Sequence, residues 1–190
     1  PAVDRPRSLP LEVIYAAARD AFPGVPLGGG MFSFFTELNR RRPPVELLDF
    51  VQHASAANVH AADDRSVMET LESLPHVFRS TRAFVGDLAY RVGPANIGMA
   101  FNPYGAATSP NPDRLKRTMV TDDPRAGALF GAAWAAGYLA RAALGRLDGV
   151  TIMAPTGPLG VVAEDGSARP AFHVLAGFAA LTGAPVLQAA

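Results

Sequence analysis

Short apolar segments alternate with helical patterns along this chain, and the alternation limits the possible folds more than any other feature. Four segments have the length and composition of buried strands, near residues 25–30, 49–53, 87–93 and 149–153. Apolar residues with a helical period lie between most of them. Strands that alternate with helices are typical of a parallel sheet covered by helices. The chain is therefore predicted to be an α/β protein.

The number of strands narrows this prediction further. A (β/α)8 barrel closes with eight strands, so four strands supply only half of one. The rival fold is an open doubly wound sheet, which usually carries a glycine-rich phosphate turn before a helix. Here Gly28-Gly29-Gly30 leads into Met31-Phe32-Ser33, which does not match that turn. We therefore expect residues 1–190 to form a single partial barrel domain of about four βα units.

Side chains that satisfy free N–H groups are expected to start the helices. Ser66 and Glu69 have capping-box spacing, so Asp64 or Ser66 is expected to cap a helix. Ser8 is expected to cap a helix that reaches about Ala21. Asp122 or Asp123 is expected to cap the longest helix, which begins at Pro124 and ends near Leu147. A last strand is expected to start within Val186 to Gln188.

Composition excludes several classes of function. Lys plus Arg and Asp plus Glu both number 17, so the chain lacks the positive charge typical of nucleic-acid binding. It has no cysteine, which excludes disulfides and cysteine nucleophiles and fits a reducing compartment, so we expect a cytoplasmic protein. No apolar run reaches the roughly 18 residues of a membrane span, so no membrane partner is expected.

Polar and aromatic segments occur in a characteristic order through residues 25–175 of the chain. Together they resemble the D-apionate lactonase family. The segments are Gly29-Gly30-x-Phe32-x-x-Phe35-Thr36-Glu37-Leu38-Asn39-Arg40 with Arg42-Pro43-Pro44, Asn58-Val59-His60-Ala61-x-Asp63-Asp64 with Ser66-Val67-x-Glu69-Thr70-Leu71, Val92-Gly93-Pro94 with Phe101-Asn102-Pro103-Tyr104, Asp123-Pro124-Arg125 with Ala133-Trp134, and Arg169-Pro170-Ala171-Phe172.

This resemblance implies a TIM barrel domain related to those of glycoside hydrolases, with the present chain as its C-terminal half, strands five to eight. It also implies hydrolysis of a sugar lactone, D-apionolactone, to the aldonic acid in sugar catabolism. Family members are much longer, so the remainder of the barrel is an expected partner. One departure is Met99-Ala100, where the family tends to have a basic residue before Phe-Asn-Pro.

Three residues are the catalytic candidates. Glu37 follows the first strand, where barrel enzymes keep their active sites, and a carboxylate there can act as general base on water. His60 and Asp63 follow the second strand, and an imidazole oriented by a carboxylate is the usual base near neutral pH. Such residues also serve as metal ligands, and Asp63 also fits a helix N-terminus. We predict no metal ion and no other cofactor.

Four further residues are candidates for substrate binding: Asn39, Arg40, Asn102 and Tyr104. Amide and guanidinium groups bind sugar hydroxyls or a developing oxyanion, and a tyrosine in a loop can cover one face of a sugar. The alternative for Asn102 is a turn-forming role before Pro103. His53, within a strand, is interpreted as a core residue, and so is Trp134, within a helix.

Other hydrolase chemistries fit this chain less well. No acidic residue occurs from Leu88 to Asn111, where the third strand ends, so a retaining glycosidase would lack its nucleophile there. No Gly-x-Ser-x-Gly elbow occurs either. The first hypothesis is therefore a lactonase-related fragment. The alternatives are a non-catalytic carbohydrate-binding or assembly half-barrel, which pairs with a partner or a second copy of the chain, and, more weakly, a glycoside hydrolase fragment.

We expect the 190-residue chain by itself to show little or no hydrolysis of sugar lactones, because half a barrel leaves half of the active-site rim unbuilt. The measurement is acid release from D-apionolactone and related aldonolactones. Turnover at an ordinary enzymatic rate by the chain alone would contradict the expectation of an incomplete barrel.

Overall fold

A computed structural model describes residues 9–187 and contains one parallel sheet. Its four strands stand in chain order, β1–β2–β3–β4, and every neighbouring pair is parallel. The predicted α/β fold with a parallel sheet is thereby confirmed. The strands are β1 (Gly28–Met31), β2 (Phe50–Ala56), β3 (Ala89–Asn96) and β4 (Gly149–Ile152).

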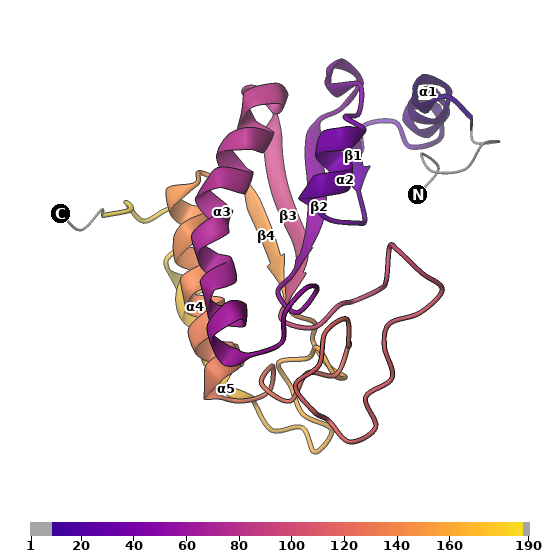
Figure 1. Cartoon of the computed structure of the whole chain (residues 1–190). Coiled ribbons are helices and arrows are strands. Elements are labelled where there is room, and N and C mark those ends of the chain that lie inside the picture. The colour runs from indigo at the N-terminus through magenta and orange to yellow at the C-terminus, as the bar shows by residue number, and fades with distance from the viewer. Residues whose placement is uncertain (1–8, 188–190) are drawn as a thin grey trace.

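Helices lie along one face of this sheet, as Figure 1 shows for α3, α4 and α5. The strands all point the same way in that view, and the long loops gather at their carboxyl ends. Parallel strands in one sheet thus place all the strand exits at one edge. The helical elements are α1 (Leu11–Ala21), α2 (Phe35–Arg40), the 3-10 turn η2 (Val45–Leu47), α3 (Asp64–Val85), α4 (Leu129–Leu144) and α5 (Pro170–Ala180).

Aromatic side chains fill the space between the sheet and these helices. Phe78 of α3 packs edge-on against Tyr90 of β3 and Tyr138 of α4, with ring centroids 6.2 and 6.4 Å apart. Trp134 lies 5.1 Å from Tyr138 and is almost completely buried. Its position confirms the interpretation of Trp134 as a core residue. This cluster holds α3 and α4 at a fixed height above the strands.

His53 of β2 belongs to the same layer and is fully paired. One ring nitrogen, Nδ1, lies 2.8 Å from the Ala54 carbonyl, which only accepts, so Nδ1 carries the proton. The other nitrogen, Nε2, then accepts from the Tyr90 hydroxyl at 2.7 Å. Burial lowers the pKa of His53 to about 4. His53 is thus a satisfied, neutral core residue, as its strand position suggested.

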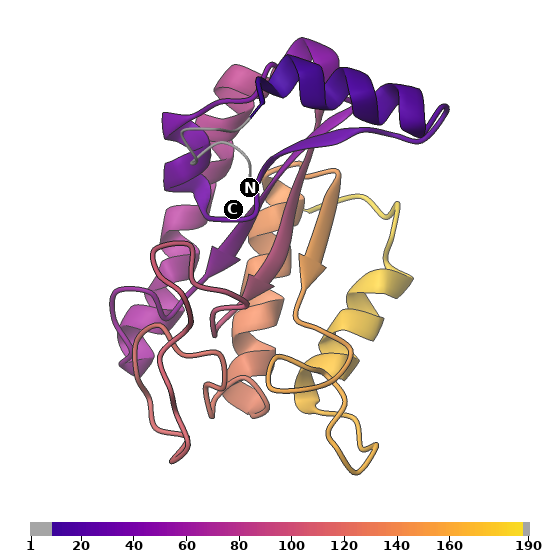
Figure 2. The same ribbon diagram turned by 90° about the vertical axis from the view of Figure 1, so that its right-hand side faces the viewer.

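The opposite face of the sheet is not covered in this way. Figure 2 looks onto this face, and no helix of the described chain runs along the strands there. Its side chains are polar or half exposed. The Arg91 guanidinium stacks 4.0 Å from the centroid of the Phe50 ring, and Gln52 donates from its amide to the Gly93 carbonyl. In a closed barrel this face is the interior.

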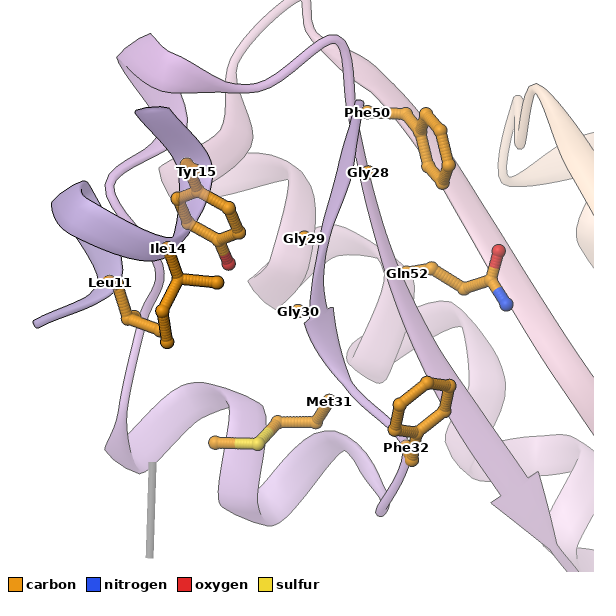
Figure 3. A pocket seen from close by; sticks show the side chains of 10 residues that line it. All are labelled: Leu11, Ile14, Tyr15, Gly28, Gly29, Gly30, Met31, Phe32, Phe50 and Gln52. Carbon is orange, nitrogen blue, oxygen red and sulfur yellow. The ribbon is translucent and has the colours of Figure 1, made fainter. Parts of the chain in front are cut away.

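The outer edge of β1 is also open. Side chains of α1, namely Leu11, Ile14 and Tyr15, point toward the bare Gly29 and Gly30, whereas Phe50 and Gln52 project on the other side of the strand (Figure 3). The side chains of α1, the residues of β1, and Phe50 and Gln52 line an apolar hollow of about 340 Å³. A strand edge without a neighbouring strand, beside an apolar hollow, is a site where another strand can add.

Two predicted helix starts are wrong. Helix α3 is capped by Asp63, whose side chain accepts from the Ser66 amide at 2.9 Å, and not by Asp64 or Ser66. Helix α4 begins at Leu129 after Ala128, and the longest helix is α3 with 22 residues. The acidic residues expected to start α4 are used otherwise, because Asp123 binds Arg125 within the preceding loop.

The predictions for the two ends of the chain concern a helix cap and a strand. Ser8, expected to cap the first helix, lies outside the described residues, and α1 follows Pro10 without a side-chain cap. Val186 and Leu187 form no strand, and Gln188 again lies outside the described part.

The buried His53 predicts how stability depends on pH. As pH falls through 6.5, the unfolded chain takes up a proton on this side chain, but the folded chain does not until about pH 4. The unfolded state then binds more protons, so stability falls as pH drops from about 6.5 to 4. Urea unfolding across this range measures it. We expect His53→Gln to flatten that slope and the exposed His76→Gln to keep it, and an unchanged slope in His53→Gln would contradict the prediction.

Candidate functional site

Asn58, two residues after the end of β2, joins two of the loops at the carboxyl edge. It is completely buried. Its backbone amide donates to the Ile97 carbonyl at 3.0 Å, and its carbonyl accepts from the Met119 amide at 2.9 Å. Its side-chain amide donates to the Val120 carbonyl at 3.0 Å. The long loop from β3 to α4, residues 97–128, is therefore held over the end of β2.

An ionic network fixes the other side of this loop. Asp64, the first residue of α3, pairs with Lys116 at 2.7 Å and with Arg125 at 3.1 Å. Hydrogen bonds from Lys116 and Arg125 hold the pKa of Asp64 below its usual value. Arg125 is nearly buried and also binds the buried Asp123 at 2.7 Å. Two carboxylates thus neutralise a guanidinium that would be costly to bury alone.

This anchored loop brings Tyr104 next to Glu37, which comes from a different part of the chain. The Tyr104 hydroxyl donates to Oε2 of Glu37 at 3.3 Å, and Arg40 lies 3.5 Å from Oε1. The Glu37 side chain is only 16% exposed. Burial and the nearby Glu37 carboxylate raise the pKa of Tyr104, so its hydroxyl keeps its proton and remains a donor. The rings of Phe34 and Tyr104 lie 6.2 Å apart.

A pocket of about 250 Å³ adjoins this group. Tyr104 and Phe34 contribute to its wall, and so does the exposed His60 from the loop after β2. The structure therefore brings together four predicted residues: Glu37, Arg40 and Tyr104 are in direct contact, and His60 lines the same pocket as Tyr104.

The other three candidates have structural partners. Asp63 caps α3, and hydrogen bonds from Ser66 lower its pKa. Asn39 accepts from Arg42 at 2.8 Å. Asn102 holds the turn that carries Tyr104, since its oxygen accepts from the Tyr104 amide and its nitrogen donates to the Ala107 carbonyl. These contacts agree with the alternatives of a helix cap for Asp63 and a turn for Asn102.

No pattern in the sequence singles out Asn58, Tyr138 or Lys116 as residues of the site. Asn58 lay within a recognised segment, but its role depends on a contact made 62 residues away. Among the described residues, no group of three or more His, Cys, Asp or Glu side chains is placed to hold a metal ion. Within the same residues no helix has both the length and the apolar character needed to cross a bilayer.

These features define a class of protein: half of a parallel β/α barrel with a carboxylate and a tyrosine at its carboxyl edge. The TIM barrel domain of D-apionate lactonase matches residues 1–183 of the chain. The chain belongs to this family, as the ordered segments suggested. It is also 46% identical to the D-apionate lactonase of Brucella anthropi over 96% of its own length, but spans only 32% of that relative.

Solved structures of similar fold include β-glucuronidases. A β-glucuronidase of Ruminococcus gnavus superimposes with a TM-score of 0.60 and 10% identity, over 92% of this chain and 28% of the enzyme. Its complex with D-glucaro 1,5-lactone gives 0.59 and 11%, over 86% of this chain and 28% of that one. At such low identity these matches support the glycoside-hydrolase-like barrel fold alone.

The anchoring role of Asn58 is testable by Asn58→Ala. The change removes the hydrogen bond to Val120 and leaves a buried carbonyl unpaired, which costs about 1–3 kcal/mol. We expect lower stability in urea and faster proteolysis within residues 97–128. Asn39→Ala, at an exposed position, is the matched control with a small effect. Equal cleavage rates in the two variants would show that Asn58 does not hold the loop.

Proposed function

We propose that this chain supplies part of the active site of an enzyme that hydrolyses a neutral sugar lactone, such as D-apionolactone, to the aldonic acid in sugar catabolism. Membership of the D-apionate lactonase family supports the reaction class. The observation that carries the proposal is the largely buried Glu37 carboxylate with the Tyr104 hydroxyl 3.3 Å away. This pair lies at the carboxyl edge of the sheet, where barrel enzymes keep their chemistry.

Lactone hydrolysis needs a base, a donor and a leaving alcohol. Glu37 accepts a proton from water as the water oxygen bonds to the lactone carbonyl carbon. Negative charge develops on the carbonyl oxygen, where Arg40 and the Tyr104 hydroxyl are donors of suitable kind. The ring C–O bond then breaks, and the proton passes to the leaving alkoxide, so that one water gives one carboxylic acid and one hydroxyl.

The remaining candidates have unequal support. His60 lines the neighbouring pocket and can bind substrate hydroxyls or assist proton transfer. Asp63, Asn39 and Asn102 already have partners within the chain, so in this proposal they shape the site and make no direct contact with the lactone. A cytoplasmic location stays a prediction.

A second candidate function is an assembly role. The open edge of β1 and the uncovered face of the sheet favour pairing with the remainder of a barrel or with a second copy of the chain. A glycosidase is less favoured, because no carboxylate occurs from Leu88 to Asn111, around the end of β3.

The catalytic proposal is tested by Glu37→Gln in the complete natural polypeptide that contains these residues. Loss of a general base typically lowers kcat by about 100-fold to 10,000-fold. Acid release from D-apionolactone measures it, with Glu46→Gln, an exposed glutamate in η2, as the matched control. Retention of more than half of wild-type kcat in Glu37→Gln would sink the assignment of Glu37 as the base.

The assembly proposal is tested by the solution mass of the 190-residue chain. We expect self-association, or association with a separately supplied polypeptide that completes the barrel. The reason is that an exposed sheet face and an open strand edge both favour contact with another chain. Light scattering coupled to size exclusion measures the mass. A well-folded chain that stays strictly monomeric at high concentration would argue against pairing of copies.

A further inference from the structure

The pocket beside Tyr104 extends inward from the edge of the sheet. Its wall includes residues at the end of β2, the start of α2 and the inner side of α3, and it also includes Tyr138 of α4. Tyr138, His53 and Ala54 are its most deeply buried members, at 1%, 2% and 2% exposure. The pocket therefore connects the exposed mouth near Phe34 and Tyr104 with the interior layer between sheet and helices.

At the inner end, one polar group has no partner. The Tyr138 hydroxyl is buried, and no group lies in good hydrogen-bonding geometry to it. The Ser55 side chain is the adjacent polar group, and its interaction with the hydroxyl lowers the pKa of Tyr138 by less than burial raises it. Both nitrogens of the neighbouring His53 are already paired. A buried hydroxyl without a partner typically costs about 1–3 kcal/mol, so a ligand hydroxyl at this place would restore a lost interaction.

The lining of the pocket indicates which ligands suit it. Among the described residues that form its wall, none is Lys, Arg, Asp or Glu. A charged ligand would lose hydration there without gaining a counter-charge. Hydroxyl groups are abundant and two aromatic rings stand at the mouth, which suits a small molecule with several hydroxyls and a carbon ring. The hydroxyl-bearing residues of the wall are Thr36, Ser55, Thr70, Ser73, Tyr104 and Tyr138.

We propose that this pocket binds a neutral polyhydroxylated molecule and that the Tyr138 hydroxyl is its innermost hydrogen-bonding group. The proposal extends the proposed function, since a neutral sugar lactone is such a molecule and Tyr104 borders both the pocket and Glu37. It also assigns a preference: the lactone is neutral, whereas its hydrolysis product carries a carboxylate and is held less well.

Binding of a polyol that cannot be hydrolysed tests the pocket separately from the reaction. The probes are xylitol and, as a charged counterpart, xylonate, followed by saturation-transfer NMR with the complete natural polypeptide. We expect xylitol to bind more tightly than xylonate. Tyr138→Phe keeps the ring and removes the hydroxyl, and should weaken xylitol binding about threefold to tenfold, the value of one neutral hydrogen bond.

Two further variants make the result specific. Tyr15→Phe removes a hydroxyl at the separate hollow beside β1 and should leave xylitol binding unchanged. Ser73→Phe adds a ring at an exposed α3 position on the pocket wall, so it should block binding without disturbing the core, even if Tyr138→Phe folds poorly. Absence of xylitol binding, or equal binding by wild type and Ser73→Phe, overturns the proposal.

Lactone kinetics then separate this proposal from the proposed function. If both hold, Tyr138→Phe raises KM for the lactone and changes kcat little. If the polypeptide hydrolyses no lactone but binds xylitol with the expected losses in Tyr138→Phe and Ser73→Phe, the pocket stands and the reaction is wrong. If it hydrolyses lactones and Tyr138→Phe leaves both xylitol binding and KM unchanged, the pocket assignment is wrong and the reaction stands.

Discussion

The arrangement of the candidate site depends on the buried hydrogen bonds of Asn58. Three bonds from one residue join the exit of β2 to both ends of the loop that follows β3. Without them, a loop of about thirty residues would lose considerable entropy to hold any single position over the sheet. Because the loop is fixed there and again at Asp64, Tyr104 reaches Glu37 across 67 residues of sequence. The position of Tyr104 beside Glu37 thus depends on buried hydrogen bonds made elsewhere in the loop.

The sheet itself has two faces of opposite character. Its helix side is closed by an aromatic cluster around Tyr90 and Tyr138, which accounts for a stable layer of packed helices. Its other side carries Arg91 and Gln52, and no helix formed by residues 9–187 covers it. In a (β/α)8 barrel this side faces the interior once further strands close around it. The chain also spans only 32% of its curated relative. An uncovered sheet face is consistent with a chain that contains only part of a barrel.

The chemistry of the edge and that of the pocket complement each other. At the edge, a mostly buried carboxylate stands next to a tyrosine that keeps its proton, which suits transfer of a proton from water. Inside, the wall lacks charge and offers hydroxyls, which suits the sugar part of a neutral lactone. In a site of this kind the carboxylate that takes part in the reaction is separate from the hydroxyl groups that bind the substrate.

The sequence by itself determined the parallel α/β fold, the family and the identity of Glu37, His60 and Tyr104 as polar residues after strands. These features depend on local patterns, because the periods of strands and helices, and the sequence in which they alternate, can be recognised from neighbouring residues. Helix starts were less secure, since Asp63, Asp64 and Asp123 are all good caps. Only the tertiary structure decided which one is used, because Asp64 and Asp123 are drawn to Arg125 by charge. The unpaired Tyr138 hydroxyl and the Asn58 anchor likewise arise from contacts between segments far apart in the chain, which no local pattern records.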